Sequence, residues 1–391
     1  MRYLLFDDEK RVELLPLAYT RPVSEFRIGI LTIKEKWLKR MPLEAVFAGY
    51  ITEDYLQDKY PSNIKDDQFW INASICPNDD LINDILSLDL NESLFDEYDN
   101  IIAFRSTDFE NLVNCKKSNT NVAFTHVQNL WDIFCKNGVE LEADFELITS
   151  GRSSHTLNAS NKVMGLENIF IEEGARVNCA ILNATAGSIY IAKDAVVMEG
   201  SMIRGPFALG EASQTKLGTK IYGPTTIGPH SKVGGELNNV VIFGYSNKGH
   251  DGFLGNSVLG EWCNIGAASN NSNLKNNYAE VRLWNYATGS FAPTGLQFCG
   301  LVMGDHSKCG INTMFNTGSV VGISANIFGT GFPRNFIPSF SWGGPKGQST
   351  YLVEKALEVV EKVMERRGVN FDENERAILT KVFELSSNYR Y

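Results

Sequence analysis

Aliphatic residues recur at every sixth position along the middle of the chain. Every position in this register except Thr215 is aliphatic, and the residues are Ile191, Val197, Ile203, Leu209, Thr215, Ile221, Ile227 and Val233. An α-helix repeats about every 3.6 residues and a single strand about every two, so neither explains this period. Coils of three short strands, each with one side chain pointing inward, do explain it. The pattern therefore predicts a parallel β-helix whose stacked coils share one apolar column.

The first 150 residues or so show a different pattern, typical of an α/β domain. Short apolar runs predict strands at Tyr3–Phe6, Val46–Tyr50, Phe69–Asn72 and Ile101–Phe104. Helical patterns run from Ile28 to Met41 and from Asp80 to Leu88. Strands that alternate with helices favour a mostly parallel sheet.

The last part of the chain has helical periodicity again. Apolar residues from Leu352 to Met364 lie on one face of a predicted helix, which Gly368 ends, and a second helix is expected from Glu373 to Leu385. We expect these helices to cap the open end of the coils. The predicted domains are thus an α/β domain at 1–150, a β-helix at 151–345 and C-terminal helices at 346–391.

Composition narrows the class of partner. The net charge of −10 disfavours nucleic acid and anionic membranes, although a local basic pocket could still bind a phosphorylated small molecule. The seven cysteines include no C-x-x-C pair, which argues against a zinc knuckle or a disulfide framework. The opening residues lack the pattern of a signal segment. We expect a cytoplasmic protein that does not insert into membranes and holds no structural metal.

The sixfold pattern breaks between residues 238 and 255, a stretch rich in Gly, Asn and Ser. We expect an interrupting loop here, because function concentrates where a rigid scaffold is interrupted. An insertion rich in Asn and aromatic residues follows at about 270–300.

The start of the chain resembles the sugar-phosphate nucleotidyltransferase domain. The resemblance rests on the run Leu15-Pro16-Leu17-Ala18-Tyr19-Thr20-Arg21-Pro22. Where that family has a Gly-rich loop, this chain has Asp7-Asp8-Glu9-Lys10-Arg11. The resemblance implies Asp8, Arg11 and Arg21 as candidates for nucleotide binding, with Mg²⁺ as cofactor if the domain is active. The alternative is a catalytically inactive domain, because glycine lets a loop approach phosphate closely.

The coils resemble the acetyltransferase half of the GlmU family of bifunctional sugar-nucleotide enzymes. The matching residues are Ser246, Lys248-Gly249-His250, Phe253-Leu254-Gly255, Asn264-Ile265-Gly266-Ala267 and Asn273. The resemblance implies a left-handed β-helix, a homotrimer with an active site where neighbouring subunits meet, and acetyl-coenzyme A as co-substrate. The whole chain resembles shortened members of this family with a reduced nucleotidyltransferase-type domain.

The same resemblance assigns roles to single residues. His250 falls on the catalytic histidine, and a neutral imidazole suits the removal of a proton from a sugar ammonium. Asn264 and Asn273 match positions that hold the sugar or the acetyl donor. Phe253 replaces a substrate-contacting tyrosine, and Asn238 replaces the lysine that holds the sugar phosphate. Arg204, Lys220, Lys232 or Lys248 could serve instead, and Gly310 and Arg334 are candidates for contact with coenzyme A.

Three alternatives stay open at this point. His250-Asp251 followed by Gly255-Asn256 also resembles an O-acyltransferase that acts on a nucleotide sugar. His230, His250 and His306 could form a zinc site, although no close histidine pair occurs. A third alternative is a trimeric scaffold without catalysis.

The preferred hypothesis is N-acetylation of an amino-sugar phosphate, with glucosamine-1-phosphate the favoured acceptor. The first domain would then convert the product with UTP to UDP-N-acetylglucosamine, as in cell-envelope biosynthesis.

Overall fold

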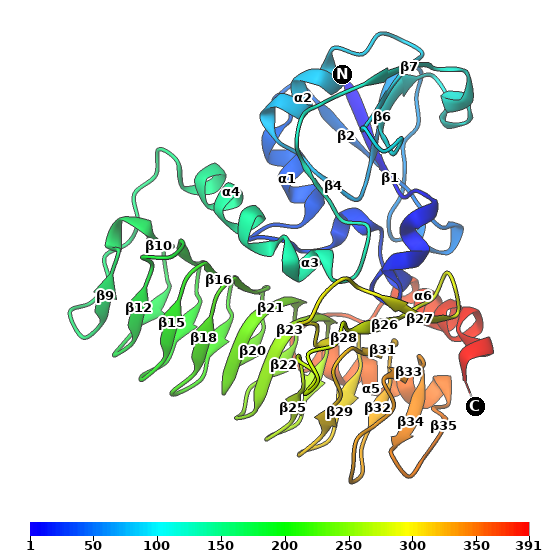
Figure 1. Cartoon of the computed structure of the whole chain (residues 1–391). Coiled ribbons are helices and arrows are strands. Elements are labelled where there is room, and N and C mark those ends of the chain that lie inside the picture. The colour runs from blue at the N-terminus through cyan, green and yellow to red at the C-terminus, as the bar shows by residue number, and fades with distance from the viewer. Residues whose placement is uncertain (391) are drawn as a thin grey trace. The chain divides into compact units, whose positions relative to one another are not determined.

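The structure, a computed structural model, describes residues 1–390. The chain divides into two compact units (Figure 1). The first comprises residues 1–14, 20–26 and 31–128, and the second comprises residues 15–19, 27–30 and 129 onward.

The first unit is built on a mixed six-stranded sheet with the order β2-β1-β3-β6-β5-β7. Its strands are β1 (Arg2–Phe6), β2 (Val46–Ile51), β3 (Gln68–Asn72), β5 (Glu92–Phe95), β6 (Ile101–Ser106) and β7 (Lys116–Asn119). The predicted strands are therefore confirmed, and so is the expectation of a mostly parallel sheet, because β2, β1, β3, β5 and β7 all run in one direction. Strand β6 runs antiparallel to both of its neighbours. The reason is that β5 and β6 form a hairpin, which needs only a short turn and no crossover helix.

Two helices of the first unit begin at side-chain caps. Helix α1 (Ile33–Arg40) starts after Thr32, which forms a capping box with Glu35, and α2 (Asp79–Leu86) starts after Asn78. These caps satisfy N–H groups that a helix leaves unpaired. A small second sheet pairs β4 (Ile75–Cys76) with β8 (Thr125–His126).

The second unit contains a left-handed parallel β-helix with three faces (Figure 1). The first face consists of β9 (Lys162–Met164), β12 (Ile181–Asn183), β15 (Met202–Arg204), β18 (Lys220–Tyr222) and the first halves of β21 (Glu236–Gly244) and β23 (Phe253–Glu261). The second face contains β10 (Ile169–Ile171), β13 (Ile189–Ile191), β16 (Phe207–Leu209), β19 (Thr225–Ile227), the second halves of β21 and β23, β28 (Leu301–Met303), β31 (Ser319–Val321) and β33 (Phe336–Ile337).

The third face is a 10-stranded sheet, and it carries the candidate site. Its strands are β11 (Arg176–Val177), β14 (Val196–Val197), β17 (Gln214–Thr215), β20 (Lys232–Val233), β22 (Asn247–Lys248), β24 (Asn264–Ile265), β29 (Lys308–Cys309), β32 (Asn326–Ile327), β34 (Ser341–Gly344) and β35 (Gly347–Thr350). All neighbours pair in parallel except β34 and β35.

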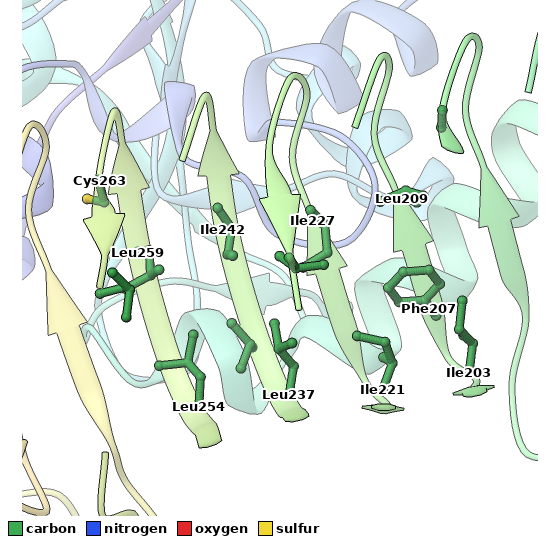
Figure 2. Packing of buried hydrophobic residues seen from close by; sticks show 14 of the residues in the cluster. Ile203, Phe207, Leu209, Ile221, Ile227, Leu237, Ile242, Leu254, Leu259 and Cys263 are labelled. Carbon is green, nitrogen blue, oxygen red and sulfur yellow. The ribbon is translucent and has the colours of Figure 1, made fainter. Parts of the chain in front are cut away.

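The predicted apolar column is confirmed. All eight residues of the sixfold register are buried. Inward-pointing side chains from successive strands lie in rows along the coils, as Figure 2 shows for Ile203, Ile221, Ile227, Ile242 and Leu259 among others. Burying such side chains is the main driving force for a fold of stacked coils.

The prediction of an interrupting loop at 238–255 is wrong for most of this stretch. Strands β21, β22 and β23 continue the coils through this stretch, and residues 249–252 lie between strands. The sixfold count fails because β21 and β23 run without interruption from the first face to the second, so that a corner is absorbed into each strand. These coils therefore need fewer residues than their neighbours.

Helices and one hairpin complete the second unit. The insertion contains the hairpin β26 (Arg282–Asn285) and β27 (Ser290–Pro293), and β25 (Asn270–Asn271) pairs with β30 (Met314–Phe315). Helices α3 (Asp132–Cys135) and α4 (Asn137–Thr149) lie against the coils, and Glu142 of α4 accepts hydrogen bonds from Ser188. The predicted C-terminal helices are confirmed as α5 (Val353–Glu365) and α6 (Glu373–Leu385). No helix within residues 1–390 has the length and apolar character needed to cross a bilayer.

Candidate functional site

His250 lies in the short loop between β22 and β23, and its side chain is exposed. The imidazole lines a cavity of about 490 Å³ in the second unit. That volume lies within the usual range for small-molecule sites. Gly249 and Gly252 flank His250-Asp251 and have no side chains, so the loop that carries the histidine is narrow. His250 is therefore placed where a ligand could reach it.

A ladder of outward-facing polar residues forms the floor of this cavity. Lys232, Asn247 and Asn264 occupy equivalent positions on successive strands of the third face and pair in register. All three line the cavity together with His250. Because adjacent strands are about 4.8 Å apart, their side chains are spaced regularly along the coils.

Lys248 occupies an inward position of the same strands. It pairs with Val233, and its neighbours in the column are aliphatic. Its Nζ donates to the backbone carbonyls of Gly234, at 3.0 Å, and His250, at 2.6 Å. Burial lowers the pKa of Lys248 to about 8, and Asp251 acts in the opposite direction. The ammonium therefore holds the His250 loop from inside the coil and does not line the cavity.

Four cationic side chains line the cavity around His250. Lys216 and Lys232 come from adjacent coils, and Arg366 and Arg367 follow the last turn of α5. Burial lowers the pKa of Lys232, and the charges of Arg367, Lys216 and Arg366 lower it further. The site is therefore suited to an anionic group.

Arg367 connects helix α5 to the coils. Its guanidinium donates to the carbonyl of His230 at 3.1 Å and to Oδ1 of Asn247 at 2.9 Å. Burial lowers the pKa of Arg367, and the nearby Arg366 lowers it further. These bonds hold the guanidinium in a defined orientation next to the polar ladder.

The structure brings some of the predicted site residues together and separates others. His250, Lys232 and Asn264 line the cavity, and Gly310 stacks behind the lining residue Gly266 on the neighbouring coil. Besides Lys248 and Gly310, four more predicted residues lie outside the lining as described for residues 1–390, and they are Phe253, Asn273, Arg204 and Arg334.

Three of these outlying residues have other surroundings. Asn273 donates to Asn256 at 2.7 Å, and the backbone N–H of Phe253 donates to Asn270 at 2.8 Å. Arg204 lines a separate hollow on the first face together with Lys220. Their predicted substrate contacts stay predictions.

Sequence reasoning missed Lys216, Asn247, Arg366 and Arg367. Asn247 and Lys232 share a signal, since both precede an inward residue on the third face. This position on each strand of the third face could not be followed in the sequence, because the coils at 236–261 have irregular lengths. Arg366 and Arg367 belong to no motif that points to a site, because in the sequence they simply follow an amphipathic helix.

The other two histidines of the coils belong to a stack of rings. His230 stacks on Tyr245, Tyr245 on Trp262, and Trp262 on the buried His306. Across the described chain, no group of three or more His, Cys, Asp or Glu side chains could hold a metal ion. The three histidines of the zinc alternative thus do not converge.

In the first unit, Asp8 and Arg11 directly follow β1, and Arg21 lies ten residues further along the chain. Arg11 is buried, and its guanidinium contacts Asp7 at 3.1 Å, Glu53 at 3.3 Å and the hydroxyl of Tyr55 at 3.3 Å. Arg21 is also buried. In this structure the Arg11 guanidinium is therefore directed at internal partners, and its role as a phosphate clamp stays a prediction.

The carboxylates nearby do not fit a resident Mg²⁺. The carboxylate of Asp7 is buried, with a side chain only 2% exposed, and accepts hydrogen bonds from Thr52, at 2.6 Å, and from the N–H of Val23, at 2.9 Å. Asp8 accepts from Asn72 at 2.8 Å. Mg²⁺ usually binds proteins through one or two carboxylates that remain open to it.

Comparison with protein families supports the assignment of the first part of the chain. Residues 3–153 match the family described as sugar nucleotidyl transferase. No curated protein matches the chain at a significant level. The match ends before β9, the first strand of the β-helix. A sugar nucleotidyltransferase domain followed by a β-helix fits the GlmU-like layout expected from the sequence.

Proposed function

We propose that the second unit is an acyltransferase that uses His250 as a general base. The observation that carries this proposal is the exposed imidazole in a cavity lined by cationic and amide side chains. A neutral imidazole can remove a proton from an amine or hydroxyl at neutral pH. The favoured reaction is the transfer of an acetyl group from acetyl-coenzyme A to the amino group of glucosamine-1-phosphate.

Two backbone groups support the same chemistry. The N–H groups of Gly249 and Ala267, both in the lining, donate to no backbone carbonyl in the described chain. Such N–H groups can stabilise the oxyanion that forms when an amine attacks a thioester. The electron pair of the amine would form the new amide bond, the thiolate would leave, and His250 would hold the amine proton at a ring nitrogen.

The first unit would supply a second reaction. The family match supports a sugar-1-phosphate as substrate, with a nucleoside triphosphate such as UTP as the partner. N-acetylglucosamine-1-phosphate would then become UDP-N-acetylglucosamine, with release of pyrophosphate. Mg²⁺ would enter with the nucleotide. A first unit without turnover is the alternative, since Arg11 contacts internal carboxylates.

The proposed enzyme is a cytoplasmic homotrimer. Four large apolar side chains exposed on successive coils of the first face support contact between copies, and they are Met164, Ile181, Met202 and Tyr222, which lie among Asn183, Arg204 and Lys220. Contiguous exposed apolar patches mark interaction surfaces.

The acyltransferase proposal is tested by free thiol release from acetyl-coenzyme A with glucosamine-1-phosphate. His250→Ala should lower the rate by about 10²–10⁴-fold, the usual contribution of a general base. His155→Ala is the matched control, because His155 is also exposed but lies outside the cavity lining. Full activity of His250→Ala would refute the proposal.

Two further assays separate the alternatives. Acyl carrier protein as a better donor than acetyl-coenzyme A would favour the O-acyltransferase that acts on a nucleotide sugar. Pyrophosphate release from UTP and N-acetylglucosamine-1-phosphate tests the first unit, and His250→Ala should leave that release unchanged. No release at high enzyme concentration would show that the first unit lacks turnover on this pair.

A further inference from the structure

The positive charge around His250 is concentrated and uncompensated. Among residues 1–390, no acidic residue lines the cavity. Within residues 1–390, none of Lys216, Lys232, Arg366 and Arg367 forms an ion pair with a carboxylate. The whole chain has a net charge of −10, so the charge of this cavity is opposite in sign to that of the chain as a whole. Like charges at close range are costly unless an anion binds among them.

The geometry of the arginine pair is suited to phosphate. Arg367 is fixed by His230 and Asn247, so its guanidinium loses little freedom when a ligand binds. Arg366 lies beside it and lines the same cavity. A guanidinium matches phosphate through paired N–H donors. A helix C-terminus favours cations by itself, but that preference does not explain why two lysines from the coils face the same space.

We propose that Lys216, Lys232, Arg366 and Arg367 bind a diphosphate group, which makes the end of α5 part of the substrate site. The proposal builds on the acyltransferase assignment in that it places the diphosphate beside His250. A single phosphate would leave much of the cationic charge unpaired, whereas a diphosphate can contact the lysines and the arginines together. A nucleoside diphosphate occurs both in coenzyme A and in nucleotide sugars, so donor and acceptor share this chemistry.

The direct test is calorimetric titration of the full chain with inorganic pyrophosphate. Binding should weaken as salt is added, because salt screens charge. Arg366→Gln and Lys232→Gln should each weaken binding by about tenfold or more, as expected for the loss of a charged hydrogen bond. Lys355→Gln on α5 and Lys193→Gln on the coils are matched controls, because both lysines are exposed outside the lining. Arg367 is not used, since it also anchors α5.

The outcomes discriminate clearly. No pyrophosphate binding to the wild type, or unchanged binding in both Arg366→Gln and Lys232→Gln, overturns the proposal. Inorganic phosphate that binds as tightly as pyrophosphate overturns the diphosphate assignment. Displacement of pyrophosphate by coenzyme A assigns the site to the donor, and displacement by UDP-N-acetylglucosamine assigns it to the acceptor.

The same titration separates this inference from the acyltransferase proposal. Pyrophosphate binding is measured on the wild type, and acyl transfer is measured on the wild type and on His250→Ala. If pyrophosphate binds but no acyl transfer is found, the diphosphate site stands and the acyltransferase proposal fails. If acyl transfer depends on His250 while the charge variants bind pyrophosphate normally, the acyltransferase proposal stands and the diphosphate proposal fails.

Discussion

The ammonium of Lys248 donates a hydrogen bond to the backbone carbonyl of His250, with 2.6 Å between Nζ and the oxygen. A second bond goes to the carbonyl of Gly234 at 3.0 Å. The lysine lies in a column of apolar side chains, where a charge is costly. The bond connects the interior of the coil to the candidate catalytic loop, and it is one reason why that loop has a defined conformation.

Lys248 should make the free energy of unfolding depend on pH in the alkaline range. Its pKa is about 8 in the folded chain and 10.5 in the unfolded chain. Between these values the unfolded chain binds one proton more, so stability rises with pH across this window. Chemical unfolding at a series of pH values should show wild type gaining about 3 kcal/mol relative to Lys248→Met from pH 7 to pH 11. Lys193→Met should show no such trend, and a constant difference for Lys248→Met would contradict the prediction.

The apolar column should respond strongly to a cavity. Ile242 is fully buried and pairs with Ile227 on one side and Leu259 on the other. Ile242→Ala should destabilise the coils by about 2–5 kcal/mol. Hydrogen exchange should show the largest loss of protection in the two adjoining coils, because each coil contacts mainly its neighbours. Leu217→Ala is the control, since Leu217 is exposed and should change stability by less than about 0.5 kcal/mol.

The sequence predicted the β-helix because its regular coils repeat a physical constraint at a fixed interval. One inward aliphatic residue per strand is visible without any structure, as at Ile203 and Ile221. Where a strand runs round a corner, as β21 does, the interval changes and the register is lost. Lys248 was therefore predicted as a possible ligand for the sugar phosphate, although it points into the column.

The candidate site was only partly predictable for a related reason. His250 and Asn264 lie in a conspicuous local motif, and both line the cavity. Arg366 and Arg367 reach the same cavity from a helix more than 100 residues further along the chain. Their position depends on how α5 packs against the coils, which periodicity within α5 does not specify. Contacts between distant segments are the part that the sequence pattern did not reveal.

Asp7 should be essential for the stability of the first unit. Its buried carboxylate accepts from the guanidinium of Arg11, the hydroxyl of Thr52 and the N–H of Val23, and so joins three segments. Asp7→Asn should destabilise this unit by about 3 kcal/mol or more, because Arg11 is left buried without its nearest carboxylate. Hydrogen exchange of residues 1–128 under mild urea measures the effect. Asp66→Asn, at an exposed position, should behave like the wild type, and equal protection in both variants would be evidence against the role of Asp7.

A charge on the first face should separate the proposed trimer into monomers. Met202 is 42% exposed, pairs with Ile181 on one side and Lys220 on the other, and lines one hollow together with Ile181 and Tyr222. Met202→Asp would place a carboxylate in a contact between copies, where its desolvation is unfavourable. Light scattering coupled to gel filtration should then report a monomer mass for Met202→Asp and a trimer mass for the wild type. Leu43→Asp is the control, because Leu43 is exposed in the first unit. A wild-type monomer, or a trimer that persists in Met202→Asp, would show that this face does not form the subunit contact.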